Sequence, residues 1–206
     1  MFKALVFSLV SCHTFIQGVL LLREIEIRGR LLTQQYEDTL SRLHSLSSAE
    51  TKSFQHDTYF CERKYVETNT TKNCPYVLRI RKSEKKSTLA YKSFVDNGSS
   101  WIEEETEISD IDSMEKILVY IGQEKYLDIK KHRVSFKYEQ MEINLDKIEG
   151  LGCFIELEII HDDIEYGKIK LKNFLIDDLK CKTIEIIDKG YVQLMEEYIT
   201  SLNTGG

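Results

Sequence analysis

The sequence predicts an α+β protein in which a mostly antiparallel sheet of about eight strands is flanked by helices. Three observations support this fold class. Short segments of alternating apolar and polar residues recur along the chain, turn sequences separate many of them, and four other segments have apolar residues at helical spacing. Eight antiparallel strands are enough to curl into a closed β-barrel, so we expect that architecture.

The first predicted strand reads REIEIRGR at residues 23–30, where charged residues alternate with isoleucines. Seven further segments have strand patterns: 53–60, 76–83, 86–94, 101–110, 126–136, 138–146 and 153–160. Turn sequences separate neighbours, such as Asn-Gly at 97–98 and Glu-Gly-Leu-Gly at 149–152. These short connections predict antiparallel pairing, and the later segment KTIEII is either a short strand or a linker.

Four helices are predicted from apolar residues three or four positions apart. The first includes Tyr36 to Leu46, with Thr33 as a candidate N-cap, and the second runs over 112–121 with Asp112 as its cap. Two more helices are expected over 165–179 and 190–202. Their apolar stripes predict that they pack against the sheet.

Composition is typical of one soluble globular domain. The chain has 206 residues, 42% of them hydrophobic and 30% charged, with one proline and no linker-like tract. Residues 22–206 are therefore expected to form a single domain. The net charge of -6 argues against a general nucleic-acid binder, so no nucleic acid is expected as a partner. A homodimer is an open alternative to a monomer.

The five cysteines are odd in number, and no two are spaced as C-x-x-C. A zinc site or a disulfide framework is therefore not expected, and reduced thiols favour a cytoplasmic location. Residues 1–21 complicate this prediction, because no Asp, Glu, Lys or Arg occurs from Ala4 to Leu22. This apolar N-terminal extension is a signal, a membrane anchor, a soluble extension or the result of a wrongly chosen start codon. A membrane is expected as a partner only if the extension is an anchor.

Charged residues alternate with apolar ones inside five of the predicted strands. Such alternation is typical of any half-exposed strand, but here acids and bases are segregated by strand. Pairs of acids are Glu24 and Glu26, Glu105 and Glu107, and Glu156 and Glu158; pairs of bases are Arg79 and Arg81, and Lys131 and Arg133. Arg28, Lys92 and Asp146 lie in strands of the same kind. If these faces point into one curled sheet, an acidic wall and a basic wall share a cavity.

Such a cavity suits a triphosphate with a divalent cation. A triphosphate carries about four negative charges and is bound by several Arg and Lys side chains. Paired carboxylates bind hard divalent cations, which also bridge phosphate oxygens. Carboxylates crowded in a cavity raise one another's pKa unless a cation neutralises them. The acidic pairs themselves therefore imply a metal ion.

Six motifs in order resemble the CYTH family, also called triphosphate tunnel metalloenzymes. Glu24 to Arg28 resembles its E-x-E-x-K signature, and QHDTYF at 55–60 resembles its Q-x-D-x-Y-F strand. The remaining motifs are LRIR with TLAYK, EEETEISD, KKHR and INLDKIEGLGCFIELE. The resemblance covers about residues 22–200. It implies an eight-stranded antiparallel triphosphate tunnel that binds Mg2+ or Mn2+.

The resemblance also implies residue roles. Candidate metal ligands are Glu24, Glu26, Glu105, Glu107, Glu156 and Glu158. Candidate substrate-binding residues are Arg28, Arg79, Arg81, Lys92, Lys131 and Arg133. Candidate catalytic residues are Arg28, Lys92 and Asp146. Arg28 departs from the signature, because the family has a lysine there and a planar guanidinium is not a point charge.

Two reactions use such a site, and the motifs look most like the class IV adenylyl cyclase branch. A cyclase converts ATP to cyclic AMP and pyrophosphate. A triphosphatase acting on thiamine triphosphate or tripolyphosphate releases orthophosphate. The change at Arg28 keeps a third alternative open, a non-catalytic module that binds a polyphosphate or nucleotide.

Overall fold

The structure is a computed structural model that describes residues 23–47, 50–68, 71–95 and 100–204. The strands are β1 Arg23–Leu31, β2 Glu50–Glu62, β3 Tyr76–Ser83, β4 Ser87–Val95, β5 Ser100–Ile108, β6 Gln123–Tyr138, β7 Met141–Ile148, β8 Gly152–His161 and β9 Glu185–Ile187. The α-helices are α1 Thr33–Leu46, α2 Arg63–Glu67, α3 Ile111–Tyr120, α4 Ile164–Asn173 and α5 Tyr191–Thr204. The predicted extension, residues 1–21, lies outside the described residues.

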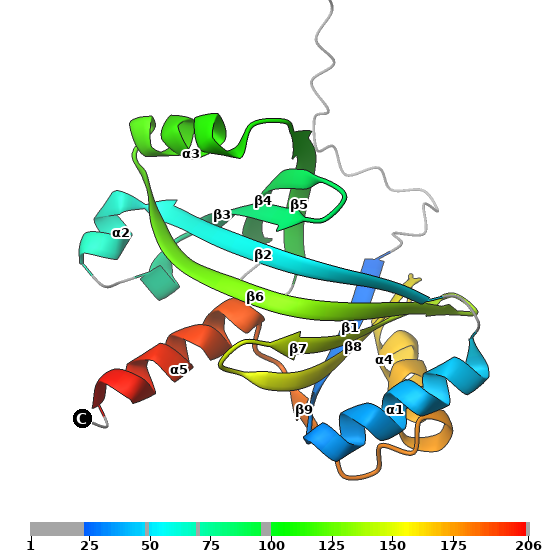
Figure 1. The fold of residues 1–206 in the computed structure, drawn as a ribbon. Coiled ribbons are helices and arrows are strands. Elements are labelled where there is room, and N and C mark those ends of the chain that lie inside the picture. The colour runs from blue at the N-terminus through cyan, green and yellow to red at the C-terminus, as the bar shows by residue number, and fades with distance from the viewer. Residues whose placement is uncertain (1–22, 48–49, 69–70, 96–99, 205–206) are drawn as a thin grey trace, which may run out of the picture.

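All nine strands form one antiparallel sheet in the order β5-β4-β3-β2-β6-β7-β8-β1-β9 (Figure 1). The predicted α+β class and antiparallel pairing are confirmed, but the closed barrel of eight strands is wrong. Among the described residues, no pairing joins β5 to β1 or β9. The physical reason is that β9, the KTIEII segment, pairs with Arg28–Arg30 and takes part of the edge of β1 that closure would need.

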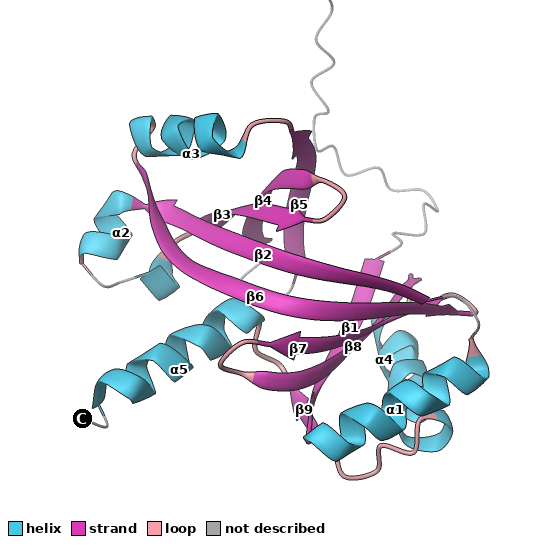
Figure 2. Cartoon of the chain, viewed as in Figure 1, coloured by secondary structure: helices cyan, strands magenta, loops and turns pink. Residues whose placement is uncertain are grey.

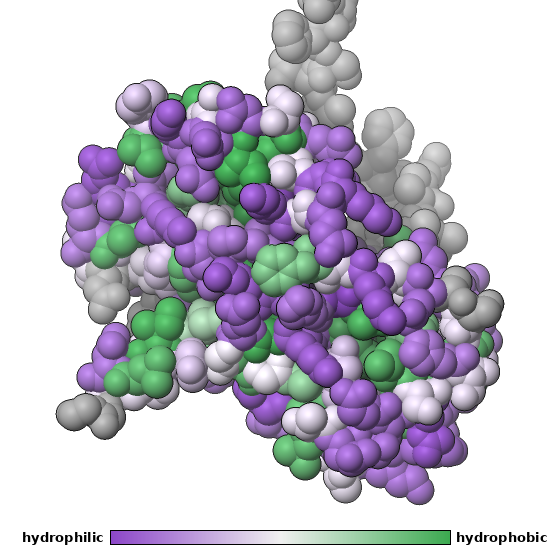
Figure 3. Space-filling view, viewed as in Figure 1, coloured by the Kyte–Doolittle hydropathy of each residue, from purple (hydrophilic) through white to green (hydrophobic). Residues whose placement is uncertain are grey.

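Helices α1, α3 and α4 cover the outer face of the sheet (Figure 2), where they pack against apolar residues of the alternating strands. Ile25 and Ile27 on β1 belong to a core that includes Leu43 of α1 and Leu171 of α4. Leu118 of α3 packs with Phe60 and Ile80 over the other half of the sheet. Hydrophilic side chains cover most of the molecular face seen in Figure 3, as expected when the apolar residues lie in these layers.

The helices begin close to the predicted positions, but both predicted caps, Thr33 and Asp112, are wrong. Helix α1 is preceded by Leu32, whose backbone N–H donates to the Gln35 side chain at 2.8 Å, so Thr33 is not the N-cap. Helix α3 is capped by Asp110, which accepts from the Ser113 backbone N–H at 3.0 Å. A cap depends on one φ/ψ transition, which a pattern of apolar residues locates only to within a turn.

The inner face is the other side of the sheet, and α5 covers one end of it. Leu194 and Met195 of α5 pack with Tyr59, Ile129 and Phe154 in a separate apolar cluster. The four cysteines of the described chain, Cys61, Cys74, Cys153 and Cys181, are free thiols. No helix in the described ranges is long and apolar enough to cross a membrane.

Candidate active site

Strand register places the charged residues on the inner face. Glu26 lies opposite Glu158, and Arg28 lies opposite Glu156. Arg133 pairs with Asp146 across β6 and β7, Asp57 with Arg81 across β2 and β3, and Lys92 with Glu103 across β4 and β5. Directly opposed residues of antiparallel strands point to the same side. The prediction that acidic and basic residues share one face is therefore confirmed by the register.

Three carboxylates at the β1–β8 pair form what we call the carboxylate cluster, Glu24, Glu26 and Glu158. One carboxylate oxygen from each lies within 4.8 Å of the others. Burial and the charges of Glu156, Glu26 and Glu24 raise the pKa of Glu158 to about 8. Burial and Glu156 also raise the pKa of Glu26. Full ionisation of the cluster is therefore unfavourable without a cation, and hard oxygen ligands of this kind fit Mg2+ or Mn2+.

Beside the carboxylate cluster on the inner face lies an ion-pair network. It is made of Arg28 on β1, Glu156 on β8, Asp146 on β7, and Arg133 and Lys131 on β6. Arg28 donates to Glu156 at 2.8 Å, and Arg133 donates to both Glu156 and Asp146, with bonds of 2.7 and 2.6 Å to the two Asp146 oxygens. Lys131 lies 3.8 Å from Asp146. Although burial alone would raise it, Arg133 and Arg28 lower the pKa of Glu156 to about 2. Glu156 is therefore ionised and paired, unlike its neighbour on the strand Glu158.

Lys131 is the least compensated cation of the network. Its side chain is only 4% exposed. Burial and the positive charge of Arg133 lower the pKa of Lys131 to about 8, against the opposing attraction of Asp146. A buried amine of this kind gains charge stabilisation from an incoming anion. It is suited to hold a phosphate.

Further ion pairs link β2, β3, β4 and β5 on the inner face. Arg81 donates two hydrogen bonds of 2.7 Å to Asp57, and these outweigh the effect of burial and lower the pKa of Asp57. Arg79 donates to Glu103 at 3.0 Å and to Glu105 at 2.8 Å. Lys92 also donates to Glu103, at 2.6 Å. These side chains connect the central strands of the sheet with its β5 edge.

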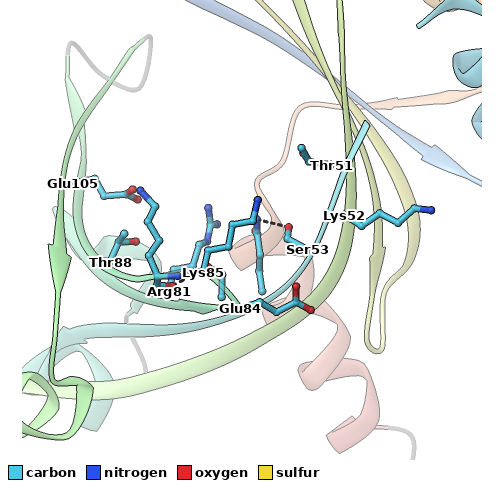
Figure 4. Close-up of a pocket in the computed structure, with 11 residues that line it drawn as sticks. Thr51, Lys52, Ser53, Arg81, Glu84, Lys85, Thr88 and Glu105 are labelled. Atoms are coloured by element: carbon cyan, nitrogen blue, oxygen red, sulfur yellow. Dashed lines mark hydrogen bonds between the residues drawn. The ribbon is translucent and has the colours of Figure 1, made fainter. Parts of the chain in front are cut away.

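A cavity of about 210 Å³ opens over β2, β3 and β4 (Figure 4). Its cationic lining residues include Lys52, Arg81, Lys85 and Lys86. Thr88 also lines the cavity and is only 2% exposed, yet its hydroxyl has no hydrogen-bond partner within the described chain. Buried polar atoms are normally satisfied, so these groups are suited to an anionic ligand that supplies the missing partner.

The structure brings some predicted site residues together and separates others. Glu24, Glu26 and Glu158 converge, whereas Glu156 lies between two arginines. Six strands of the sheet separate β5 from β1 in the pairing order. Arg28, Arg133, Lys131 and Asp146 form one network, while Arg79, Arg81 and Lys92 lie on β3 and β4.

Glu105 and Glu107 on β5 face basic partners instead of the carboxylate cluster. Glu105 accepts from Arg79, and Glu107 lies 3.4 Å from Lys86 with a side chain 72% exposed. No metal site that includes either of them is found among the described residues. Their assignment as metal ligands stays a prediction.

Sequence reasoning missed Asp57 and Tyr191. Asp57 lies in the QHDTYF segment, and its alternation with Gln55 and Tyr59 could have placed it on the inner face. Tyr191, the first residue of α5, donates a 3.0 Å hydrogen bond to Asp146, and the guanidinium of Arg28 lies 4.3 Å from its ring centre. No local pattern signals contacts between residues so far apart in the chain.

The chain is similar in sequence to a known protein family. A family model described as the CYTH domain matches residues 22–191. A protein of Methanocaldococcus jannaschii, named "Putative adenylate cyclase MJ0240", is 35% identical over 150 residues, which cover 69% of this chain and 82% of the relative.

Solved structures have the same fold. A conserved hypothetical protein from Pyrococcus furiosus is similar with a TM-score of 0.65 and 26% identity, covering 84% of this chain and 99% of that one. A Hippeastrum protein, described as a "putative adenylyl cyclase" with a dominant triphosphatase activity, has a TM-score of 0.64 at 19% identity, covering 85% and 96% of the two chains. At that identity the second similarity shows the fold alone.

Proposed function

The chain belongs to the CYTH domain family, and from this premise we propose that it is an enzyme that acts on a triphosphate with Mg2+ or Mn2+. The observation that carries the proposal is the arrangement of charge on the inner face. Three carboxylates converge on β1 and β8, and arginine and lysine side chains follow on β6 and β3. This order matches a substrate that is anionic and carries a divalent cation.

The carboxylate cluster would hold the cation. Its three oxygens lie close enough to share one ion, and the raised pKa of Glu158 reflects a negative charge that a cation would neutralise. When bound, the ion would stabilise charge on phosphate oxygens and lower the pKa of an attacking oxygen. The proposal names Glu24, Glu26 and Glu158 as ligands, and Glu156 as a neighbour that keeps the arginines in place.

Arg81, Arg133 and Lys131 would bind the phosphates. Each is held by an aspartate, Arg81 by Asp57 and the other two by Asp146. Fixed guanidinium groups stabilise charge on phosphate oxygens without reorganising during the reaction. Arg28 already uses several of its guanidinium N–H donors. They bond to Glu156, to the Lys189 carbonyl and to Glu26.

We therefore assign Arg28 and Asp146 to positioning, since Asp146 has no exposed surface with which to touch a substrate. Arg28 would hold Glu26 and Glu156 in place, and Asp146 would hold Arg133 and Lys131. Lys92 contacts Glu103 and stays a candidate for phosphate binding. The attacking oxygen would be supplied by the substrate or by water, so no protein nucleophile is needed.

We favour hydrolysis of the terminal phosphate bond as the reaction. In it water attacks the terminal phosphorus, the bridging P–O bond breaks, and orthophosphate leaves. Support comes from two aromatic side chains in the described part of the inner face, Tyr59 and Phe154, which are only 7% and 0% exposed. Neither offers a ring on which an adenine could stack.

Cyclisation of ATP is the second candidate. Here the ribose 3′-hydroxyl attacks the α-phosphorus and pyrophosphate leaves. The printed name of the M. jannaschii relative favours it.

One experiment separates the alternatives. The purified chain is incubated with tripolyphosphate, thiamine triphosphate or ATP, each with Mg2+, Mn2+ or EDTA. Orthophosphate marks a triphosphatase, and cyclic AMP with pyrophosphate marks a cyclase. Saturable, cation-dependent binding without turnover marks the non-catalytic module. Absence of both binding and turnover with all three substrates contradicts the proposal.

A further inference from the structure

Tyr191 lies where several charges of the ion-pair network meet. Its ring centre is 4.3 Å from the Arg28 guanidinium carbon and 5.2 Å from the Lys131 ammonium nitrogen. Its hydroxyl donates to Asp146 at 3.0 Å, and Phe154 contacts the ring edge-on with centroids 5.2 Å apart. The residue is only 8% exposed, so these contacts, and not solvent, surround it.

The backbone just before Tyr191 also helps to hold Arg28. The backbone carbonyl of Lys189 accepts a 2.6 Å hydrogen bond from Arg28. Leu194 and Met195, one helical turn further along α5, are buried in the apolar cluster on the inner face. Apolar packing thus fixes the start of α5, and its first residue, Tyr191, contacts the ion-pair network.

We propose that Tyr191 is a positioning residue that holds Arg28, Lys131 and Asp146 in place, and thereby aligns the phosphate-binding residues Lys131 and Arg133. The inference rests on the proposed function, because it assigns to Tyr191 the alignment of that same site. The residue itself does not touch the substrate. It makes the C-terminal helix part of the site, although the charged residues all lie on strands.

The chemistry of the ring explains the role. Arg28, Lys131 and Arg133 are three cations that share two acidic partners, Asp146 and Glu156, so they repel one another until an anionic ligand is bound. The negative face of an aromatic ring attracts a cation without adding a formal charge. A carboxylate in its place would neutralise the phosphate-binding cations. A tyrosine orients them and leaves their charge available.

The test compares variants of similar shape but different ring electronics. Tyr191→Phe keeps the ring and removes the hydroxyl, while Tyr191→pentafluorophenylalanine keeps the shape and reverses the ring quadrupole. The matched controls are Tyr198→Phe and Tyr198→pentafluorophenylalanine, because Tyr198 lies on the same helix with its ring close to Gly150. The readouts are KM and kcat for tripolyphosphate with Mg2+.

We expect the phenylalanine variant at position 191 to change KM about twofold and the fluorinated variant to raise it about tenfold, with a smaller change in kcat. The position 198 pair should differ from each other by less than twofold. Equal KM values for the two position 191 variants would overturn the proposal, as would an equal effect at position 198.

A second readout does not depend on turnover. The Arg28 side-chain Nε–H signal in nitrogen-15 NMR should shift and exchange faster with solvent in the fluorinated position 191 variant than in Tyr191→Phe. If the wild-type chain neither binds nor cleaves any tested triphosphate, the proposed function fails and this signal alone decides whether Tyr191 positions Arg28. An unchanged signal would contradict that role.

Discussion

The carboxylate cluster and the ion-pair network meet on β1 and β8, yet Glu158 of the cluster and Glu156 of the network are in opposite electrostatic states. Glu156 and Glu158 are two residues apart on one strand and face the same side. Burial would raise the pKa of Glu156, but the neighbouring arginines outweigh it and lower that pKa to about 2. Burial and neighbouring carboxylates raise the pKa of Glu158 to about 8. The acids of the ion-pair network are balanced by cations of the same network. The carboxylate cluster needs a bound cation to balance its carboxylates.

The largest effect is expected from a change in the carboxylate cluster. Glu158→Gln removes one ligand charge, so kcat/KM for the preferred triphosphate should fall by about 100-fold or more, with weaker Mn2+ binding by calorimetry. The control Glu107→Gln removes a carboxylate from an equivalent sequence pattern on β5, where Glu107 faces Lys86. It should change kcat/KM less than threefold. Equal losses in both variants would show that β5 belongs to the metal site after all.

The second prediction concerns stability of the ion-pair network. Arg133→Met leaves the buried Asp146 and Glu156 short of one partner, so the free energy of unfolding should fall by about 3–5 kcal/mol in urea titrations. Arg63→Met removes an exposed ion pair with Glu124 and should cost about 0–1 kcal/mol. Similar losses in the two variants would contradict the distinction between a buried network and surface pairs.

The pH dependence of stability tests the raised pKa of Glu158. In the cation-free protein, the folded state keeps this proton up to about pH 8 while the unfolded chain has lost it above about pH 4.5. The folded state therefore binds more protons between these values, and its stability falls as pH rises. The slope should reach at most about 1.4 kcal/mol per pH unit in EDTA. Glu158→Gln should flatten it, as should a saturating divalent cation.

The smallest effect is expected in the cavity over β2, β3 and β4. Lys85→Gln removes an exposed cation from its lining, so KM should rise about two- to fivefold at low salt and approach the wild-type value at 1 M salt. Lys168→Gln removes an exposed charge on α4 and should leave KM unchanged. A loss of equal size at position 168 would mean that net charge, and not this cavity, attracts the substrate.

Alternation in the sequence was enough to predict which charges share a face. Glu24, Glu26 and Arg28 alternate with Ile25 and Ile27, and antiparallel register carries that alternation to the next strand. The acidic and basic rows were therefore predictable as residues of one face. The role of each charged residue was not predictable, because it depends on the order in which the strands pair. That order places β5 far from β1 along the sheet.

The open sheet and the contacts of Tyr191 could not be predicted, for a common physical reason. Strand β9 has three residues, too few for a period of two to be recognised, yet it occupies the edge of β1. Tyr191 bonds to Asp146, which lies 45 positions earlier in the chain. Both features depend on contacts between distant segments, which leave no local pattern in the sequence.

The central claim is that the cation binds at the carboxylate cluster and that the phosphates bind at the arginine and lysine side chains of β3 and β6. The most direct measurement is a crystal structure of the chain with Mn2+ and tripolyphosphate, with anomalous scattering collected at the manganese edge. We expect an anomalous peak bound by Glu24, Glu26 and Glu158, with phosphate oxygens against Arg133 and Arg81. Manganese bound elsewhere, or phosphates on the outer face, would contradict it.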